Sequence, residues 1–225
     1  MNKNYLSPIF LFITSIFITS LIVSNVTGVK LALLFGEVLP AAIIIFPITY
    51  IIGDVLTEVY GFKKARSVIW LGFFCNLIFV TAIWIAGLLP PASFWSENQQ
   101  SYESILGSTP RLLIASLCAY AIGELINSLV LSRLKIATKG KWLWSRTISS
   151  TVVGQGLDSL IFITIAFTGT PGIVRMILLQ WAVKVVYEVL ATPITYLIVG
   201  YLKKKENIDT TDHEISILPF SNSND

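Results

Sequence analysis

Charged residues are scarce in this chain. Asp, Glu, Lys and Arg make up 13% of its 225 residues and hydrophobic residues 54%, whereas about a quarter of the residues of a soluble protein are charged. The composition predicts an all-α, polytopic membrane protein, a bundle of six transmembrane helices, because apolar runs long enough to cross about 30 Å of hydrocarbon recur along the chain. These predicted spans are residues 7–27, 41–60, 68–89, 111–131, 147–168 and 177–200.

Cysteine and histidine are also rare. Cys75 and Cys118 both fall inside predicted spans, where a free thiol is a small packing residue, so neither a disulfide framework nor a metal motif follows. The only histidine, His213, lies in the polar C-terminal stretch, which excludes a histidine-based site inside the membrane. The chain lacks a Gly-x-x-x-x-Gly-Lys-Ser/Thr loop and so cannot bind ATP in that way. We therefore expect no enzyme activity, no cofactor, no metal and no nucleic-acid partner.

The segments between the spans are short, and the chain divides into a transmembrane domain, residues 1–205, and a disordered cytoplasmic tail, residues 206–225. The first span has no Ala-x-Ala-like cleavage site, and we expect it to be retained rather than removed as a signal peptide. Residues 31–39, LALLFGEVL, are too short to span and are predicted to form an outer loop or a re-entrant piece.

Basic residues set the predicted orientation. Twelve of the 16 lysines and arginines precede span one, follow span six or lie in the loops after spans two and four. Only Lys30, Arg111 and Arg175 fall on the opposite side, where the long 90–110 connection carries no base. Because Lys and Arg concentrate in cytoplasmic loops, both termini are predicted to be cytoplasmic, in a multi-pass protein of the cell (inner) membrane.

Six ionisable residues nevertheless lie inside the apolar runs. At a helix centre facing lipid each would cost roughly 2.5–3.5 kcal/mol, and together they would rival an entire fold's stability of about 5–15 kcal/mol. They must therefore face the bundle interior or a watery cavity. These residues are Asp54, Glu58, Glu124, Asp158, Lys184 and Glu188.

Their spacing is consistent with shared polar faces. Residues four apart lie on one side of a helix, as Asp54 and Glu58 do. The alternative for Glu58 is a position at the cytoplasmic interface, beside the Lys63–Arg66 loop. A small-residue stripe on span four, suited to close helix contact, leads to Asn127. Its members are Ala115, Ala119 and Gly123.

Spans four and five share a short pattern. GELIN at 123–127 and GQGLD at 154–158 both fit Gly-(Glu/Gln)-x-(Ile/Leu)-(Asn/Asp), and their polar residues fall near mid-membrane, where transporters bind substrates. One interpretation is that these groups only hold helices together. Five acids against one lysine leave a formal charge of −4, however, and mere helix contact does not require such an imbalance. The imbalance favours a transporter.

The chain resembles the queuosine precursor transporters, within the vitamin uptake transporter group. The resemblance lies in FPITYIIGDVLTEVYGFKKAR (46–66), AYAIGELINSLVLSRL (119–134), SSTVVGQGLDSLIFITIAF (149–167) and VKVVYEVLATPITYLI (183–198). It implies import of cyano- or aminomethyl-deazaguanine bases for salvage of the tRNA nucleoside queuosine. The polar positions that match are Asp54, Glu124, Gln155, Asp158 and Lys184, while the first span matches weakly.

A guanine-type edge offers two adjacent N–H donors beside a carbonyl, which a carboxylate and an amide or lysine can satisfy. We therefore predict Asp54 and Glu58 as coupling or gating residues. The predicted substrate-binding residues are Glu124, Asn127, Gln155, Asp158, Lys184 and Glu188. Three other functions stay open: a substrate-binding subunit that needs a separate ATP-driven energy-coupling module, an intramembrane protease with an acid pair, and a structural subunit without a ligand.

Overall fold

The computed structural model describes residues 7–34, 37–107, 110–169 and 171–212. This part of the chain is almost entirely helical, with one small antiparallel hairpin. In chain order, the first six elements are α1 (Pro8–Thr27), β1 (Leu31–Leu34), β2 (Glu37–Pro40), η1 (Ala41–Ile44), α2 (Phe46–Val55) and η2 (Leu56–Tyr60). The next six are α3 (Phe62–Leu88), η3 (Ser93–Asn98), α4 (Gln99–Ile105), α5 (Pro110–Ala137), α6 (Leu143–Phe167) and α7 (Ile173–Glu206).

Five of the described helices, α1, α3, α5, α6 and α7, are long and apolar enough to cross a membrane. The chain is thus an all-α, polytopic membrane protein, as predicted. The second predicted span, residues 41–60, is built differently: η1, α2 and η2 follow one another, and no single helix covers it. The 15 residues of α2 and η2 rise about 22 Å at 1.5 Å per residue, which is short of the roughly 30 Å hydrocarbon core.

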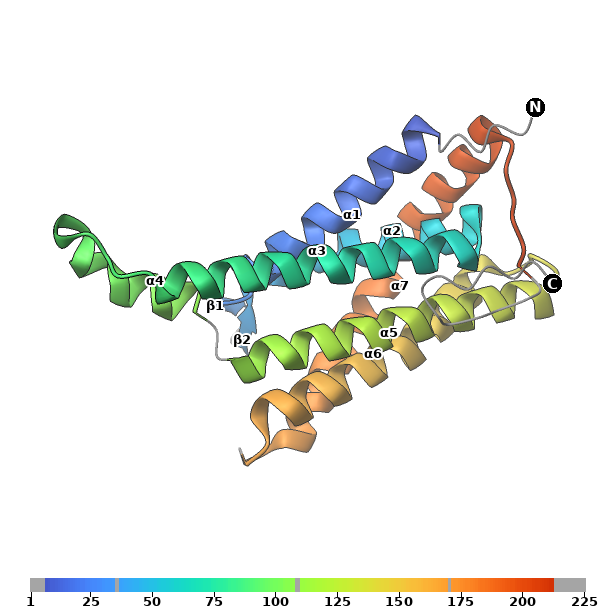
Figure 1. Cartoon of the computed structure of the whole chain (residues 1–225). Helices are drawn as coiled ribbons and strands as arrows, with labels where there is room; N and C mark the ends of the chain where they lie inside the picture. Colours follow the sequence, from blue (N-terminus) through green and yellow to red (C-terminus); the bar gives the residue numbers. More distant parts are fainter. Residues whose placement is uncertain (1–6, 35–36, 108–109, 170, 213–225) are drawn as a thin grey trace, which may run out of the picture.

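Helices α1 and α3 run in the same direction, because α2 and η2 lie between them in the chain, and from α3 onward the long helices alternate in direction (Figure 1). The start of α1 and the end of α7 meet at one end of the bundle, where the Ser7 hydroxyl donates to Glu206 Oε1 at 2.6 Å. The β1–β2 hairpin and α4 lie at the opposite end (Figure 1). Elements that are distant in sequence therefore share each end of the bundle.

The segment 31–39, predicted as a loop or re-entrant piece, is largely a hairpin. Leu31 pairs with Pro40 and Leu34 with Glu37. No alternation of polar and apolar residues indicated strands here. Pairing the two short strands satisfies backbone N–H and C=O groups that an irregular loop near the membrane would leave without partners.

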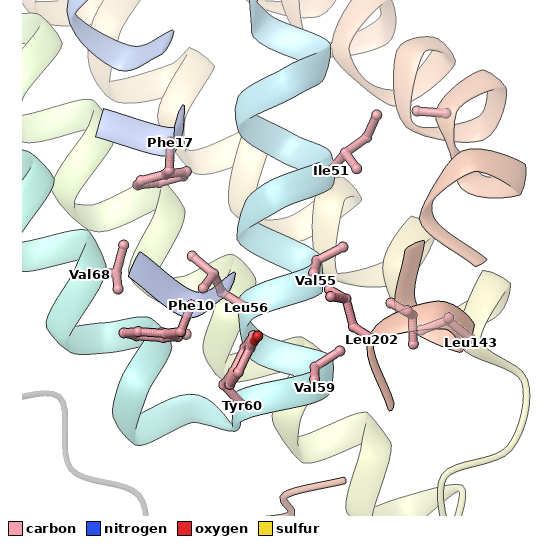
Figure 2. Close-up of a cluster of buried hydrophobic side chains, with 13 residues drawn as sticks. Phe10, Phe17, Ile51, Val55, Leu56, Val59, Tyr60, Val68, Leu143 and Leu202 are labelled. Atoms are coloured by element: carbon pink, nitrogen blue, oxygen red, sulfur yellow. The ribbon is translucent and has the colours of Figure 1, made fainter. Parts of the chain in front are cut away.

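The shortest span lies at the centre of the core. All ten residues from Gly53 to Phe62 are buried, and the main apolar cluster packs side chains of α1, α3, α6 and α7 around α2 and η2 (Figure 2). Because every face of this element is buried, it contacts protein on all sides and is shielded from lipid. Polar side chains on this element consequently project into the protein interior.

The second half of this element is a π-helix, η2. The Thr57 hydroxyl bonds both the Gly53 carbonyl and Ser128 Oγ of α5, each at 3.0 Å. Gly61 then ends the helix at a φ of +86°, a conformation that disfavours any side chain. Such π-helical turns are frequent at functional sites, and this one carries Glu58.

Helices α5 and α6 form a tight antiparallel pair. A Cβ at Gly123 would collide with Asp158 and with the Gly154 backbone, and a Cβ at Gly154 would collide with Asn127 and with the Gly123 carbonyl. The crossing is therefore locally symmetric: the glycine of each helix faces the residue four positions beyond the glycine of the other. Ala115 and Ala119 are also buried, and the predicted small-residue stripe is confirmed.

This close approach makes a stability prediction. Gly154→Ala should lower the thermal unfolding midpoint of the purified protein, because overpacking a tight contact costs about 1–3 kcal/mol. Gly200→Ala on α7 is the matched control, since nothing lies within 4 Å of the Cβ it would add and Ala is favoured over Gly in a helix. Equal midpoints for the two variants would contradict the tight crossing.

Candidate functional site

The six charged residues of the spans are withdrawn from lipid. Asp158 is half-buried, and the other five are at most 7% exposed. Together with the polar residues around them, these six residues form two clusters. The central cluster comprises Tyr50 and Asp54 of α2, Glu124 and Asn127 of α5, Thr151, Gln155 and Asp158 of α6, and Lys184 and Glu188 of α7. The end cluster comprises Glu58, Lys135, Arg146, Lys203 and Asp209.

The α5–α6 crossing organises the central cluster. Asn127 and Asp158 flank the two glycines at which the helices touch. From there, Asn127 Nδ2 donates to Asp54 Oδ1 at 3.0 Å, and Asp158 forms an ion pair with Lys184. The crossing thereby connects α5 to α2 on one side and α6 to α7 on the other.

Two further carboxyl groups occupy the same interior. Glu124 Oε1 lies against Gly53, where a Cβ would collide with it, and it faces Asp158, Lys184 and Glu188 electrostatically. Glu188 is completely buried and lies beside Thr151. Four acids thus share this region with one lysine.

Several buried acceptor atoms in the central cluster have no hydrogen-bond partner. They are Asp54 Oδ2, Glu124 Oε1 and Asn127 Oδ1, and the buried Glu188 carboxylate lies beside a single hydroxyl, that of Thr151. A buried polar atom without a partner typically costs about 1–3 kcal/mol, and such atoms are uncommon in folded proteins. All of these atoms accept hydrogen bonds, so the cluster is complementary to a group rich in donors.

Gln155 is buried on the face of α6 that carries Thr151 and Ser159, since residues four apart lie on one side of a helix. Tyr50 was missed by the sequence interpretation. It is buried and within electrostatic range of Asp158, Glu124 and Glu188. Its position one helical turn before Asp54 was the available signal. Trp181 of α7 packs beside the cluster. Its indole N–H donates to the Val152 carbonyl of α6 at 2.9 Å and holds α7 against α6.

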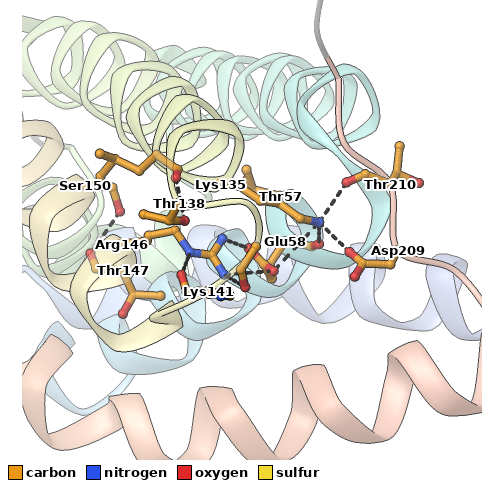
Figure 3. A network of polar contacts seen from close by, with 12 residues as sticks. Thr57, Glu58, Lys135, Thr138, Lys141, Arg146, Thr147, Ser150, Asp209 and Thr210 are labelled. Atoms are coloured by element: carbon orange, nitrogen blue, oxygen red, sulfur yellow. Dashed lines mark hydrogen bonds and ion pairs between the residues drawn. The ribbon is translucent and has the colours of Figure 1, made fainter.

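Glu58 occupies the end cluster, one turn along the chain from Asp54 (Figure 3). Arg146 binds its carboxylate through both terminal nitrogens, and Lys203 Nζ lies 2.8 Å from Glu58 Oε1. Lys135 Nζ donates to the Glu58 backbone carbonyl at 2.6 Å. Three cations from α5, α6 and α7 therefore surround this acid. Arg146 was expected in a loop, but the structure places it in the first turn of α6.

The end cluster also holds part of the segment expected as a tail. Asp209 Oδ1 accepts from Lys135 at 2.5 Å and lies 3.0 Å from Lys203. Burial alone would raise the pKa of Asp209, but the hydrogen bonds from the two lysines outweigh it and hold that pKa below its ordinary value. Thr210 N donates to the Val59 carbonyl at 3.2 Å. His213 and the rest of the predicted tail lie outside the described residues.

The two acids four residues apart on span two therefore have different surroundings. Asp54 meets a neutral amide, and Glu58 meets three cations. The structure places Asp54 within electrostatic range of Glu124 and Glu188, and Glu124 in turn within range of Asp158 and Lys184. It also gives Asp54 and Asp158 separate partners, which is not the shared hydrogen bond of an aspartic protease pair.

Removing the acid of the end cluster should be strongly destabilising. Glu58→Gln leaves Arg146, which is 1% exposed, without its carboxylate, and breaking a buried ion pair costs about 3–5 kcal/mol. Asp209→Asn removes a carboxylate whose side chain is 57% exposed, for which about 0–1 kcal/mol is expected. Thermal unfolding in detergent compares the two, and a larger effect of Asp209→Asn would refute this ranking.

A family model described as "Putative vitamin uptake transporter" matches residues 40–198. The chain is 33% identical over 147 residues to the "Probable queuosine precursor transporter" of Bacillus subtilis (strain 168), a match covering 65% of this chain and 64% of that protein. For the protein of the same name in Haemophilus influenzae, identity is 29%, over 54% of this chain and 49% of the relative. No solved structure matches.

The "Queuosine precursor transporter" of Escherichia coli (strain K12) is 26% identical, over 56% of this chain and 54% of that protein. The matches thus span less than two thirds of each relative. The family match, in contrast, covers most of the chain and contains the whole central cluster. The chain therefore belongs to the vitamin uptake transporter family and is a multi-pass membrane protein.

Proposed function

We propose that this chain imports queuosine precursors, cyano- or aminomethyl-deazaguanine bases, across the cell (inner) membrane for salvage of queuosine. The observation that carries the proposal is the convergence of acids, amides and a lysine from four helices at one buried place. Polar side chains buried inside a membrane protein mark substrate pathways. The names of the relatives supply the class of substrate.

The donor and acceptor pattern supports recognition of the base. Glu124 and Asp158 offer carboxylate oxygens to the adjacent N–H groups of a guanine-type edge, and Gln155 or Lys184 offers a donor to its carbonyl. The Asp158–Lys184 pair holds both partners ready at one position. Asn127 and Glu188 complete the substrate-binding set on the neighbouring helices.

Glu58 serves as the gating residue in this proposal. Its carboxylate links η2 to α6 and α7, and the Lys135 ammonium adds α5. An ion-pair network that joins four elements at one end of a bundle closes that end. Asp54, one turn away, connects the gate to the central cluster through Asn127 and serves in coupling. Alternating access requires such a closed end to open.

The proposed topology has six spans, with η1, α2 and η2 forming the second, and both termini in the cytoplasm. The contact between Ser7 and Glu206 supports termini on one side. Lys135, Arg146 and Lys203 gather at that end, and basic residues favour the cytoplasmic side.

Reporter fusions test this topology. Alkaline phosphatase inserted in the outer 90–98 connection should be active, because the enzyme requires an oxidising compartment, and fusions at Met1 and Asp225 should be inactive. A cytoplasmic fluorescent reporter at the same three positions should give the inverse pattern. Reporter activities that place the two termini on opposite sides of the membrane would require an odd number of spans and would refute the proposed bundle.

Transport itself is tested with the purified protein in liposomes. Labelled deazaguanine base should accumulate, and Gln155→Ala and the double variant Asp158→Asn with Lys184→Met should each reduce uptake at least about tenfold, the loss expected for one charge-assisted hydrogen bond. The double variant removes both charges of the pair, so no unpaired charge stays buried. Glu97→Gln in the exposed η3 segment is the control.

The liposome format also separates the proposal from its main alternative, a binding subunit that depends on an ATP-driven energy-coupling module. Such a subunit would bind the base but not transport it alone. Uptake that is normal in both site variants would refute the assigned residues. A chain that neither binds nor transports the base would instead favour a structural membrane subunit.

A further inference from the structure

The two clusters differ in how many cations accompany their buried acids. In the end cluster, Glu58 is surrounded by Lys135, Arg146 and Lys203. The same helices supply only Lys184 to the central cluster, and it is paired with Asp158. Asp54, Glu124 and Glu188 are thus left with no cation of their own. Buried charges are normally paired, as Glu58 is by three cations in the end cluster.

The acids without a cation lie next to one another. Glu188 and Glu124 both lie within electrostatic range of Asp54. Asp54 Oδ2 and Asn127 Oδ1 lack donors, and Asp54 and Asn127 are joined directly. The Glu188 carboxylate lies beside one hydroxyl, that of Thr151. The three residues that carry these atoms are at most 3% exposed. Three neighbouring side chains from three helices therefore present unsatisfied acceptors.

Among the residues that the structure describes, no three His, Cys, Asp or Glu side chains converge closely enough to hold a metal ion. A primary ammonium group matches better: it carries one positive charge and three N–H donors, against three acceptor side chains. Its hydrogen bonds to carboxylates are charge-assisted and stronger than neutral ones.

We propose that Asp54, Asn127 and Glu188 form a subsite for a primary ammonium group on the transported base, so that the site prefers an aminomethyl-substituted ring to a neutral cyano-substituted one. This inference rests on the proposed function and adds the charge of the substrate to it. The planar ring occupies the Glu124, Gln155 and Asp158 side, and the ammonium group reaches the α2–α7 side.

Competition measurements in liposomes test the subsite. Unlabelled aminomethyl- and cyano-deazaguanine are titrated against the labelled base, with the hydroxymethyl analogue as a neutral ligand of similar size. The wild-type protein should bind the aminomethyl base at least about tenfold more tightly than either neutral base. Because this comparison varies only the ligand, it does not depend on how any variant folds.

Variants then locate the preference. Asp54→Asn and Glu188→Gln should each lower the ratio of aminomethyl to cyano affinity, measured by competition on the same variant, about tenfold, whatever they do to the rate of uptake, and Glu97→Gln should leave this ratio unchanged. If neither base is taken up by the wild-type protein, the proposed function fails. If both are taken up without an aminomethyl advantage, or if the variants weaken both bases equally, the proposed function stands and the ammonium subsite is refuted.

Discussion

The backbone contact between Gly123 and Gly154 is the constraint on which the site depends. Only because neither residue has a side chain can α5 and α6 approach this closely. The contact places Asn127 and Asp158 on either side of one crossing, and these two residues reach α2 and α7 through Asp54 and Lys184. A bulkier residue at the crossing would separate the helices and with them the two halves of the cluster. Packing and recognition therefore share one determinant.

A second constraint is electrostatic. Two unit charges 4 Å apart interact several-fold more strongly inside a protein than in water, and removing each from water is costly. The end cluster resolves this by surrounding one acid with several cations, which joins four elements. The central cluster leaves its acids under-neutralised, a state that favours occupation by protons or by a ligand. The carboxylate of the end cluster is thus fully paired, whereas the carboxylates of the central cluster keep acceptor atoms without a partner.

Residue patterns predicted that the charged side chains lie inside and that span four carries a small-residue stripe, because these follow from the cost of polar groups in lipid and from helical spacing. The grouping of Glu124, Asp158 and Lys184 was implied by the family resemblance instead. The hairpin at 31–40 was not predictable in this way, since it has no alternating pattern. Nor were the partners of Glu58: Lys135 and Arg146 are distant in sequence, and loop charges indicate sidedness rather than pairing. Tertiary contacts decide such pairs, and spacing along one helix carries no information on them.

The positions of the two clusters along the helices bear on the direction of opening. Asp158 follows Arg146 by 12 residues on α6, about 18 Å of helix, so Asp158 lies well inside the bundle from the end at which Glu58 lies. The most accessible charged side chains of the central cluster are Asp158 and Lys184, at 17% and 9% exposure. Asp54 and Glu188 are deeper, at 1% and 0% exposure. A ligand that enters beside Asp158 and Lys184 would therefore meet the proposed ring-binding groups first and Asp54 and Glu188 last. Neutralising Asp54 would remove charge one helical turn from Glu58, and this is the physical link that the proposed gate requires between occupation of the site and opening of the end cluster.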